Sequence, residues 1–225
     1  MQFLWGDHIL QSNPRGPFYS SRDWIIARLS FDEHDCNSNL TKLGSKNRLS
    51  ATEEDNVEDA KEPLQLIRRL KNHPSEFFPV DSENAEPSML FHDDLSKHNI
   101  LINDEGALTG VVDWECVSAL PLWKACYYPA FLVGRPRDEE PKIHLYGNRI
   151  DPNELFWEHL MDYERTKLRR YFVNVLRSLE PEWVRVFEST RRQRDFDYAV
   201  QYCSSSFSIR KVNKWLDNLS SKNDS

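Results

Sequence analysis

Two short motifs in the chain carry side chains that could take part in phosphoryl transfer. The first runs from His92 to Asn99 and contains Asp94, and the second contains Asp113 within Val-Val-Asp-Trp-Glu. Transfer from a nucleotide to a hydroxyl needs a carboxylate near the acceptor proton and hard oxygen ligands for the magnesium that bridges the phosphates. Asp94, Asn99 and Asp113 are residues of these types. Taken singly, each motif could also be a polar loop beside an ordinary hairpin, because loops are rich in Asp and Asn.

The residues between the motifs predict a β-hairpin that would bring them together. Residues 100–102 are apolar and residues 108–112 carry Leu, Thr and two Val, and the two segments flank a turn with Asn, Asp and Gly. Asn99 comes just before the first strand and Asp113 just after the second, so both fall at the same end of the hairpin, where paired strands lie about 5 Å apart. We therefore expect Asn99 and Asp113 to converge with Asp94.

These motifs resemble those of the aminoglycoside phosphotransferase and choline kinase family, a branch of the protein-kinase-like fold. Two further segments, Gly16–Trp24 and Trp114–Trp123, are similar to fungal members of that family. The similarity extends from about Phe3 to Leu219.

The resemblance implies a kinase-type active site. Asp94 falls on the catalytic base of the family, and Asn99 and Asp113 fall on its magnesium ligands. His92 would complete the catalytic loop as a hydrogen-bonding brace. The implied cofactors are ATP and Mg²⁺, and the implied acceptor is a small-molecule hydroxyl.

Two neighbouring residues, Lys97 and Glu115, are expected to support the site, and a third, Asp93, departs from the family pattern. Lys97 and Glu115 are the residues that we expect to contact the cofactor, and Glu115 would support the metal shell or the acceptor. Asp93 stands where relatives commonly carry Gly or Asn, and a second carboxylate there is tolerable if it points to solvent.

The fold class that we expect is α+β and mainly helical, with residues 1–225 forming the C-terminal lobe of a protein-kinase-like fold around a small catalytic β-hairpin. No two glycines before Asp94 lie close enough to form a Gly-rich phosphate loop, and no Val-Ala-Ile-Lys-like strand precedes it. We therefore expect the N-terminal nucleotide lobe to be absent, the isolated chain to be inactive, and the exposed lobe interface to favour self-association.

The sequence is also compatible with two other functions. The chain could be a non-catalytic binding or scaffolding module that retains the motif by descent, or a protein kinase relative. The second is disfavoured because Asp113 is followed by Trp114 and Glu115 instead of Phe-Gly, and because Ser96 stands where a protein kinase has a Lys. The acceptor itself cannot be read from the chain, since one scaffold hosts many substrates.

Charge and cysteine content narrow the partners and the compartment. The net charge of -7 and the pI near 5.5 argue against nucleic acid or an anionic membrane as main partner. The four cysteines are widely spread and form no Cys-x2-Cys pair, which disfavours zinc and predicts free thiols in the cytoplasm. Residues 117–134 are the most apolar stretch, but two prolines and Lys124 interrupt them, so we interpret them as a core segment.

Helical patterns fill most of the remaining chain. We expect helices after Ser20 or Ser21, from Pro63 to about Phe77, from a cap at residues 151–154, and from Pro181 and Ile209. Residues 37–59 are interpreted as a flexible or partly ordered insertion, residues 135–147 as a charged surface loop and residues 220–225 as a disordered tail. The aromatic and aliphatic stripe of the helix after residue 154 is interpreted as core. By resemblance, that helix and the preceding loop would shape the acceptor pocket.

Overall fold

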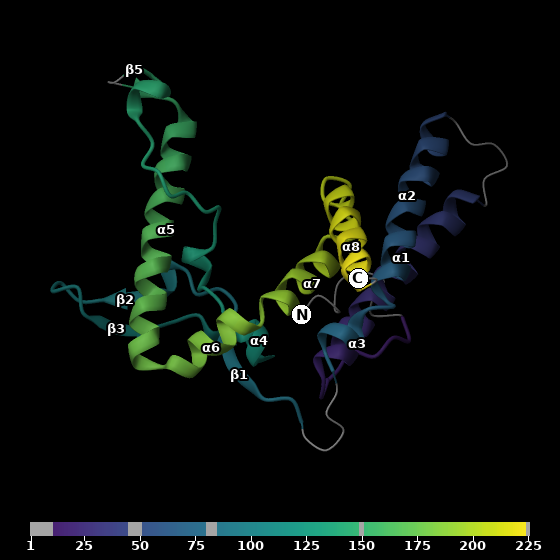
Figure 1. Ribbon diagram of the computed structural model, residues 1–225, viewed down its shortest axis with the longest axis horizontal. Helices are drawn as coiled ribbons and strands as arrows, with labels where there is room; N and C mark the ends of the chain where they lie inside the picture. Colours follow the sequence, from purple (N-terminus) through teal and green to yellow (C-terminus); the bar gives the residue numbers. More distant parts are fainter. Residues whose placement is uncertain (1–10, 45–50, 80–84, 149–150, 224–225) are drawn as a thin grey trace. The chain divides into compact units, whose positions relative to one another are not determined.

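The computed structural model describes residues 11–44, 51–79, 85–148 and 151–223 and divides the chain into two compact units (Figure 1). The first unit holds residues 1–86 and 191–225, and the second holds residues 87–190. The chain that we expected as one lobe thus has two units. Helices predominate and the strands are short, so the structure agrees with the α+β, mainly helical class. Among the described helices, none is long and apolar enough to cross a membrane.

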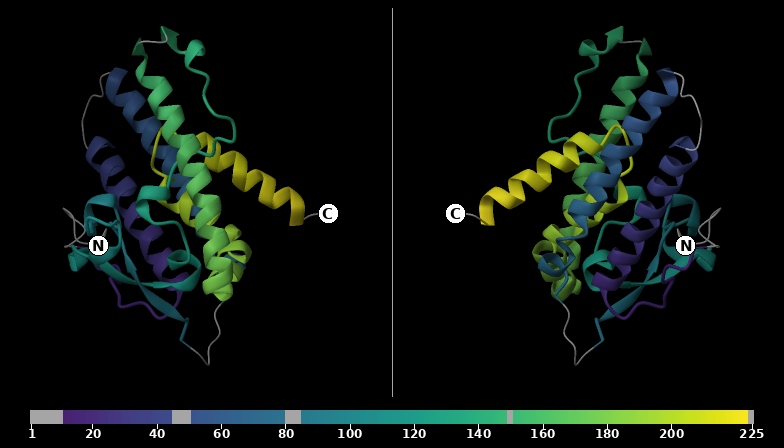
Figure 2. Two further views of the ribbon diagram at one scale, coloured as in Figure 1. Left: turned by 90° about the vertical axis from the view of Figure 1, so that its left-hand side faces the viewer. Right: turned by 90° about the vertical axis from the view of Figure 1, so that its right-hand side faces the viewer.

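Within its described residues the first unit has helices and connecting loops but no strands. The helices are α1 (Ser21–Gly44), α2 (Ala51–Leu70), α3 (Pro74–Phe77), α7 (Arg191–Gln201) and α8 (Ile209–Asn223). α1 and α2 run side by side, as Figure 1 and Figure 2 both show, while α7 contacts α1 and α8 contacts α2. Their apolar faces form a core in which ten side chains are almost fully enclosed: Ile25, Leu29, Phe31, Leu66, Ile67, Leu70, Phe196, Val200, Cys203 and Leu216.

A buried ion pair joins α1 to α7 inside this core. The Arg28 guanidinium donates to the Asp197 carboxylate, and the two side chains are only 8% and 11% exposed. Arg28 also lies over the Trp24 ring, 5.0 Å from its centroid. Because an unpaired charge is costly in an apolar interior, each partner depends on the other.

Two expectations for the first unit differ from the structure. Pro63 does not open a helix, because α2 already begins at Ala51 and carries Pro63 inside it. A proline inside a helix removes one backbone hydrogen bond, and the buried side chains of the following turns, Leu66 and Ile67 among them, favour the helix by packing into the core. The described parts of the expected insertion at 37–59 are helical, and residues 45–50 lie outside the described residues.

The predicted starts of α1 and α8 are both confirmed. The Ser20 hydroxyl accepts a hydrogen bond from the Asp23 amide at 3.1 Å, which caps the start of α1. α8 begins at Ile209 as expected and continues to Asn223. Most of the segment expected as a disordered tail therefore has helical backbone, and residues 224–225 lie outside the described residues.

The second unit contains three pairs of antiparallel strands. β1 (Ser88–His92) pairs with β4 (Val117–Pro121), β2 (Ile100–Ile102) with β3 (Leu108–Val111), and β5 (Gly147–Asn148) with β6 (Asp151–Pro152). The predicted hairpin is confirmed, with Ile100 opposite Val111 and the returning strand one residue shorter than expected. Asn103 accepts the hydrogen bond from the Gly106 amide in the turn, and Gly106 supplies the positive φ that the turn requires.

The helices of the second unit are α4 (Leu122–Ala125), α5 (Glu154–Leu179) and α6 (Pro181–Ser189). The cap of α5 is Asn153, whose side-chain oxygen accepts from the Phe156 amide, while Asp151 belongs to β6. The expectation that the whole stripe of α5 is core is wrong: Phe156 is buried, but Leu168 and Tyr171 are exposed. Periodicity predicts which side chains share a face, but the neighbours that cover that face are set by tertiary packing.

The apolar segment that follows the second motif is partly confirmed as core. Trp123, Ala125, Cys126 and Leu132 are buried, whereas Val133 is about half exposed. The unit also contains short 3₁₀ helices. They are η3 (Lys97–Asn99), η4 (Trp114–Cys116), η5 (Ala130–Leu132) and η6 (Ile143–Leu145).

Candidate functional site

Asn99 links the two carboxylates that the motifs predict. Its Nδ2 donates to the backbone oxygen of Asp94 at 2.8 Å and lies 3.5 Å from Asp94 Oδ2 and 3.4 Å from Asp113 Oδ2. Asn99 is buried, whereas both aspartates are exposed. The three residues thus converge as the hairpin predicted, with open carboxylates held against a buried amide.

The loop between Asp94 and Asn99 is closed by its own backbone. The Ser96 amide donates to the Asp94 oxygen at 2.8 Å, and the Asn99 amide donates to the Ser96 oxygen at 3.1 Å. The Ser96 hydroxyl caps η3 by accepting from the His98 amide at 3.3 Å. These local bonds fix the separation of the Asp94 and Asn99 side chains. The capping role of Ser96 was not predicted from the sequence, although a serine before a short polar turn is a capping signal.

Asp113 has an unusual backbone conformation. With φ 66° and ψ 48°, it is the one non-glycine residue with positive φ within the described ranges. The Val112 amide just before it donates to the Asn99 oxygen at 3.0 Å, which prolongs the hairpin pairing up to the site. An L-residue in this region is strained, and it stays there only because its surroundings hold it. Such residues gather at functional sites.

His92 connects β1 to the backbone beside Asp113. Its ring is buried, and Nε2 lies 2.9 Å from the Val112 carbonyl oxygen. A carbonyl only accepts, so Nε2 carries the proton in this contact. Nδ1 is then a buried nitrogen that has no hydrogen-bond partner within the described part of the chain. Trp114 covers the ring edge to face at 4.9 Å and donates its own Nε1 hydrogen to Val111.

The remaining predicted residues stand at the rim of this group. Lys97 on η3 and Glu115 on η4 are both exposed, and within the described ranges neither makes an ion pair or a side-chain hydrogen bond. Asp93 is exposed as well, and its carboxylate accepts a hydrogen bond from the Ser118 hydroxyl on β4. The extra carboxylate is therefore tied to the neighbouring strand.

The donor set suits magnesium better than a transition metal. No group of three or more His, Cys, Asp or Glu side chains that could hold a metal occurs among the described residues. The Asn99 amide nitrogen donates to the Asp94 carbonyl, so the atoms that a hard cation could bind here are Asn99 Oδ1 and the Asp113 carboxylate oxygens. Magnesium accepts such a sparse oxygen set, because it keeps several waters and relies on substrate phosphates.

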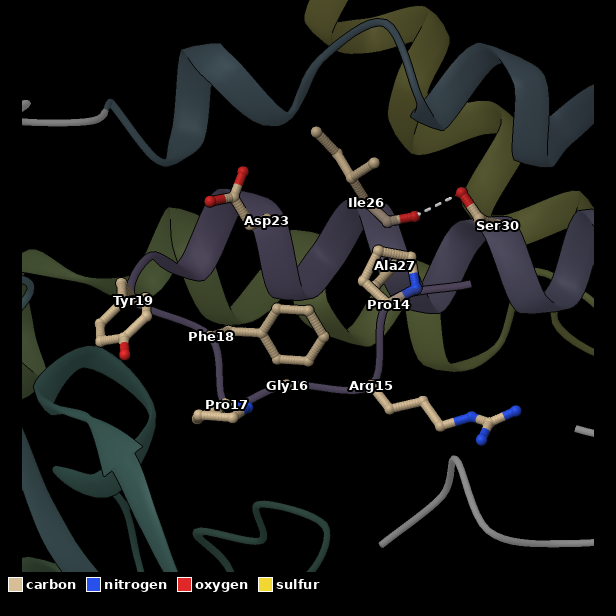
Figure 3. Close-up of a pocket in the computed structure, with 10 residues that line it drawn as sticks. All are labelled: Pro14, Arg15, Gly16, Pro17, Phe18, Tyr19, Asp23, Ile26, Ala27 and Ser30. Carbon is tan, nitrogen blue, oxygen red and sulfur yellow. Dashed lines mark hydrogen bonds between the residues drawn. The ribbon is translucent and has the colours of Figure 1, made fainter. Parts of the chain in front are cut away.

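A separate cavity lies in the first unit, between the loop from Pro14 to Tyr19 and the first turns of α1 (Figure 3). Its volume is about 460 Å³, within the range of small-molecule pockets. Asp23 is the one carboxylate of its lining. None of the residues predicted from the motifs lines this cavity, so the candidate site is the open group at the end of the hairpin.

Comparison with known proteins agrees with the motifs. Residues 26–123 match the family model described as the phosphotransferase enzyme family, and this segment contains all six predicted site residues. Clavilactone A biosynthesis cluster protein Y of Ampulloclitocybe clavipes is 32% identical over 107 residues, which are 46% of this chain and 24% of that protein. The chain thus matches about a quarter of this relative's length. No solved structure matches the chain.

Proposed function

We propose that the chain provides the catalytic part of an ATP-dependent phosphotransferase that acts on a small-molecule hydroxyl, because residues 26–123 match the model of the phosphotransferase enzyme family. On this proposal its fold is the C-terminal lobe of a protein-kinase-like fold. The observation that carries the proposal is the meeting of Asp94, Asn99 and Asp113 around one buried amide.

Each residue of the group has a chemical task in this reaction. Asp94 accepts the proton of the acceptor hydroxyl as the oxygen forms its bond to the γ-phosphorus and the bond to the ADP oxygen breaks. Asn99 Oδ1 and the Asp113 carboxylate would hold Mg²⁺, which when bound neutralises charge on the phosphates. His92 holds the Val112 carbonyl and so keeps Asp113 in its left-handed conformation.

The rigidity of the site also supports this function. Positioning and electrostatic stabilisation supply most of the catalysis in phosphoryl transfer, so the ligands must be held before the substrate arrives. Here the Asn99 amide, the His92 ring and the strained Asp113 backbone are all fixed by contacts within the second unit. An ordinary hairpin end would not need a non-glycine residue with positive φ.

One observation favours a second candidate, a non-catalytic binding module. Before Asp94 the chain has only Gly6, Gly16 and Gly44, too widely spaced for a loop that cradles phosphates. Lys97 also makes no ion pair or side-chain hydrogen bond with any described residue that would fix it for phosphate binding. On either candidate we expect residues 1–225 alone to transfer no phosphate, because these residues supply the base and the metal ligands but no phosphate cradle.

The test is phosphoryl transfer by the longest natural form of the protein. Transfer from radiolabelled ATP with Mg²⁺ would be measured with a panel of polyols, amino alcohols and hydroxy acids. Asp94→Asn should lower turnover by roughly 10²-fold or more, because a general base contributes about that much. The matched control is Asp93→Asn, which removes the adjacent carboxylate and should leave most of the turnover. Full activity in Asp94→Asn would remove the proposed role, and saturable nucleotide binding without any transfer would favour the binding module.

A further inference from the structure

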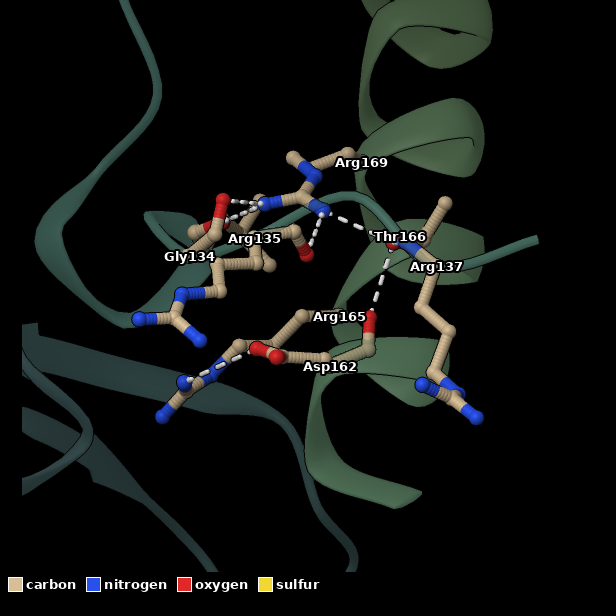
Figure 4. Close-up of polar contacts among 8 residues, drawn as sticks. Gly134, Arg135, Arg137, Asp162, Arg165, Thr166 and Arg169 are labelled. Atoms are coloured by element: carbon tan, nitrogen blue, oxygen red, sulfur yellow. Dashed lines mark hydrogen bonds and ion pairs between the residues drawn. The ribbon is translucent and has the colours of Figure 1, made fainter. Parts of the chain in front are cut away.

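A buried arginine fixes the loop that follows η5 to the middle of α5. Arg169 is 9% exposed, and its guanidinium donates to the backbone oxygens of Leu132, Gly134 and Arg135 at 2.9 to 3.0 Å and to the Thr166 hydroxyl at 2.7 Å (Figure 4). None of these acceptors is a carboxylate. The four hydrogen bonds tie the loop to α5. Within the described part of the chain the buried guanidinium contacts backbone carbonyls, a hydroxyl and, at 6.0 Å, the Tyr128 ring.

Two further arginines project from this fixed framework. Arg135 comes from the loop and Arg165 from α5, one turn before Arg169, and Figure 4 shows their guanidinium groups directed to the same side of the loop. Neither donates a hydrogen bond to any of the described residues. The Arg165 guanidinium is 4.0 Å from the Asp162 carboxylate, beyond hydrogen-bond distance. Each guanidinium carries five N–H donors, and these are open to a ligand.

Gly134 makes the close approach of Arg165 to the loop possible. A methyl group on Gly134 would lie 3.3 Å from Arg165 Cδ and 3.4 Å from its Nη1, and 3.3 Å from Asp162 Oδ1. The 3.3 Å separations are tighter than most side-chain contacts, so a methyl group at this position would shift the Arg165 and Asp162 side chains by a few tenths of an ångström. The glycine thus helps to place one arginine beside the residue that bears the other.

Neighbouring arginines do not share this arrangement. Arg137 donates to the Glu139 backbone and to the Tyr146 hydroxyl, and Arg170 is paired with Asp138. Their donors are already used. Arg135 and Arg165 are therefore the two arginines near this loop whose guanidinium groups stay without a hydrogen-bond acceptor among the described residues.

We propose that Arg135 and Arg165 form an oxyanion site that binds the carboxylate or phosphate group of a small molecule. The two guanidinium groups are directed to one side of the loop, where both could donate charge-assisted hydrogen bonds to one oxyanion. The ion pair between Arg165 and Asp162 offsets part of the positive charge of this pair. The buried charge of Arg169 adds to the attraction. Asp162 stays beside Arg165 and can accept a hydroxyl of the same ligand.

The oxyanion site does not depend on the proposed function, because it uses none of the residues Asp94, Asn99 and Asp113. The binding test therefore omits ATP and magnesium, so its result and that of the transfer assay are independent.

The test is titration calorimetry of the full chain with inorganic phosphate and, separately, with acetate at constant ionic strength. Constant ionic strength is needed because exposed charges are screened by salt. We expect saturable binding that weakens by roughly tenfold or more in Arg135→Gln and in Arg165→Gln, as loss of a charged hydrogen-bonding partner implies. The control is Arg177→Gln, which removes an exposed arginine of the same helix that is already paired with Glu188.

The two probes and a third variant make the outcome decisive. Preference for phosphate would identify a phosphate ester as ligand, and preference for acetate would identify a carboxylic acid. Gly134→Ala retains both charges and shifts the Arg165 side chain only slightly, so it should weaken binding less than Arg165→Gln does while the circular dichroism spectrum is unchanged. No saturable binding of either anion, or equal weakening in Arg177→Gln, would overturn the proposal.

Discussion

Replacing Asp113 by glycine should stabilise the protein while removing a proposed metal ligand. The residue has φ 66°, a conformation that costs an L-residue about 1–2 kcal/mol and glycine none. Against this, glycine loses about 0.5–1 kcal/mol through the greater freedom of the unfolded chain. The difference predicts that Asp113→Gly raises the free energy of unfolding by about 0–1.5 kcal/mol.

Two other contributions of the Asp113 side chain enter this balance. Its carboxylate lies 3.4 Å from Asn99 Nδ2, but that nitrogen keeps its shorter bond to the Asp94 backbone when the carboxylate is removed. Loss of one of two neighbouring exposed carboxylates also relieves repulsion, which adds at most about 1 kcal/mol of stability. Neither contribution reverses the expected sign.

Urea unfolding followed by circular dichroism would measure the change. Asp113→Ala keeps the unfavourable φ and should be no more stable than the natural protein. Glu115→Gly, two residues later in η4, has no positive φ to relieve and should lose about 0.5–1 kcal/mol. If Asp113→Gly were destabilising to the same extent as Glu115→Gly, the inference that the site stores backbone strain would be refuted.

Three further predictions concern the first unit. Arg28→Met leaves the Asp197 carboxylate buried and should lower the free energy of unfolding by about 3–5 kcal/mol, whereas adding Asp197→Leu should recover part of the loss in urea titrations. Burial raises the pKa of the Cys203 thiol, so iodoacetamide at neutral pH should label it only after unfolding, and rapid labelling of the native protein would contradict this. A hydrogen bond from Lys71 lowers the pKa of Glu33 below its ordinary 4.5, so its stabilisation is present above that value and disappears as the pH falls through the lowered pKa. Glu33→Gln should therefore cost up to about 1 kcal/mol at pH 7 and nothing at low pH, as thermal unfolding across the pH range would show.

Short-range features of the site were predictable from the sequence because they depend on residues close together along the chain. The spacing from Asp94 to Asn99 lies within one loop, and the turn before Gly106 returns β3 beside β2. Asn99 and Asp113 therefore meet at one end of a hairpin whatever the rest of the molecule does.

Helix boundaries were less predictable where local preference and tertiary packing disagree. Pro63 favours a helix start, yet α2 begins twelve residues earlier, and its last turns are buried against the core. The stripe of α5 has the right period for a core face, but Leu168 and Tyr171 have no neighbours that cover them fully. A proline in a helix interior costs about 3 kcal/mol, and burial of several large side chains, at about 1.5–3 kcal/mol each, outweighs it.

The sequence by itself determined the chemistry of this protein: two carboxylates and one amide, their spacing, and the hairpin that joins them. The tertiary structure alone decided how rigidly they are held. The His92 ring reaches Val112 from β1, and Asp113 is kept at positive φ. Elsewhere in the second unit, Arg169 holds a loop more than thirty residues away along the chain. These contacts join distant segments, and their existence depends on which surfaces meet during folding, which no local pattern of residues specifies.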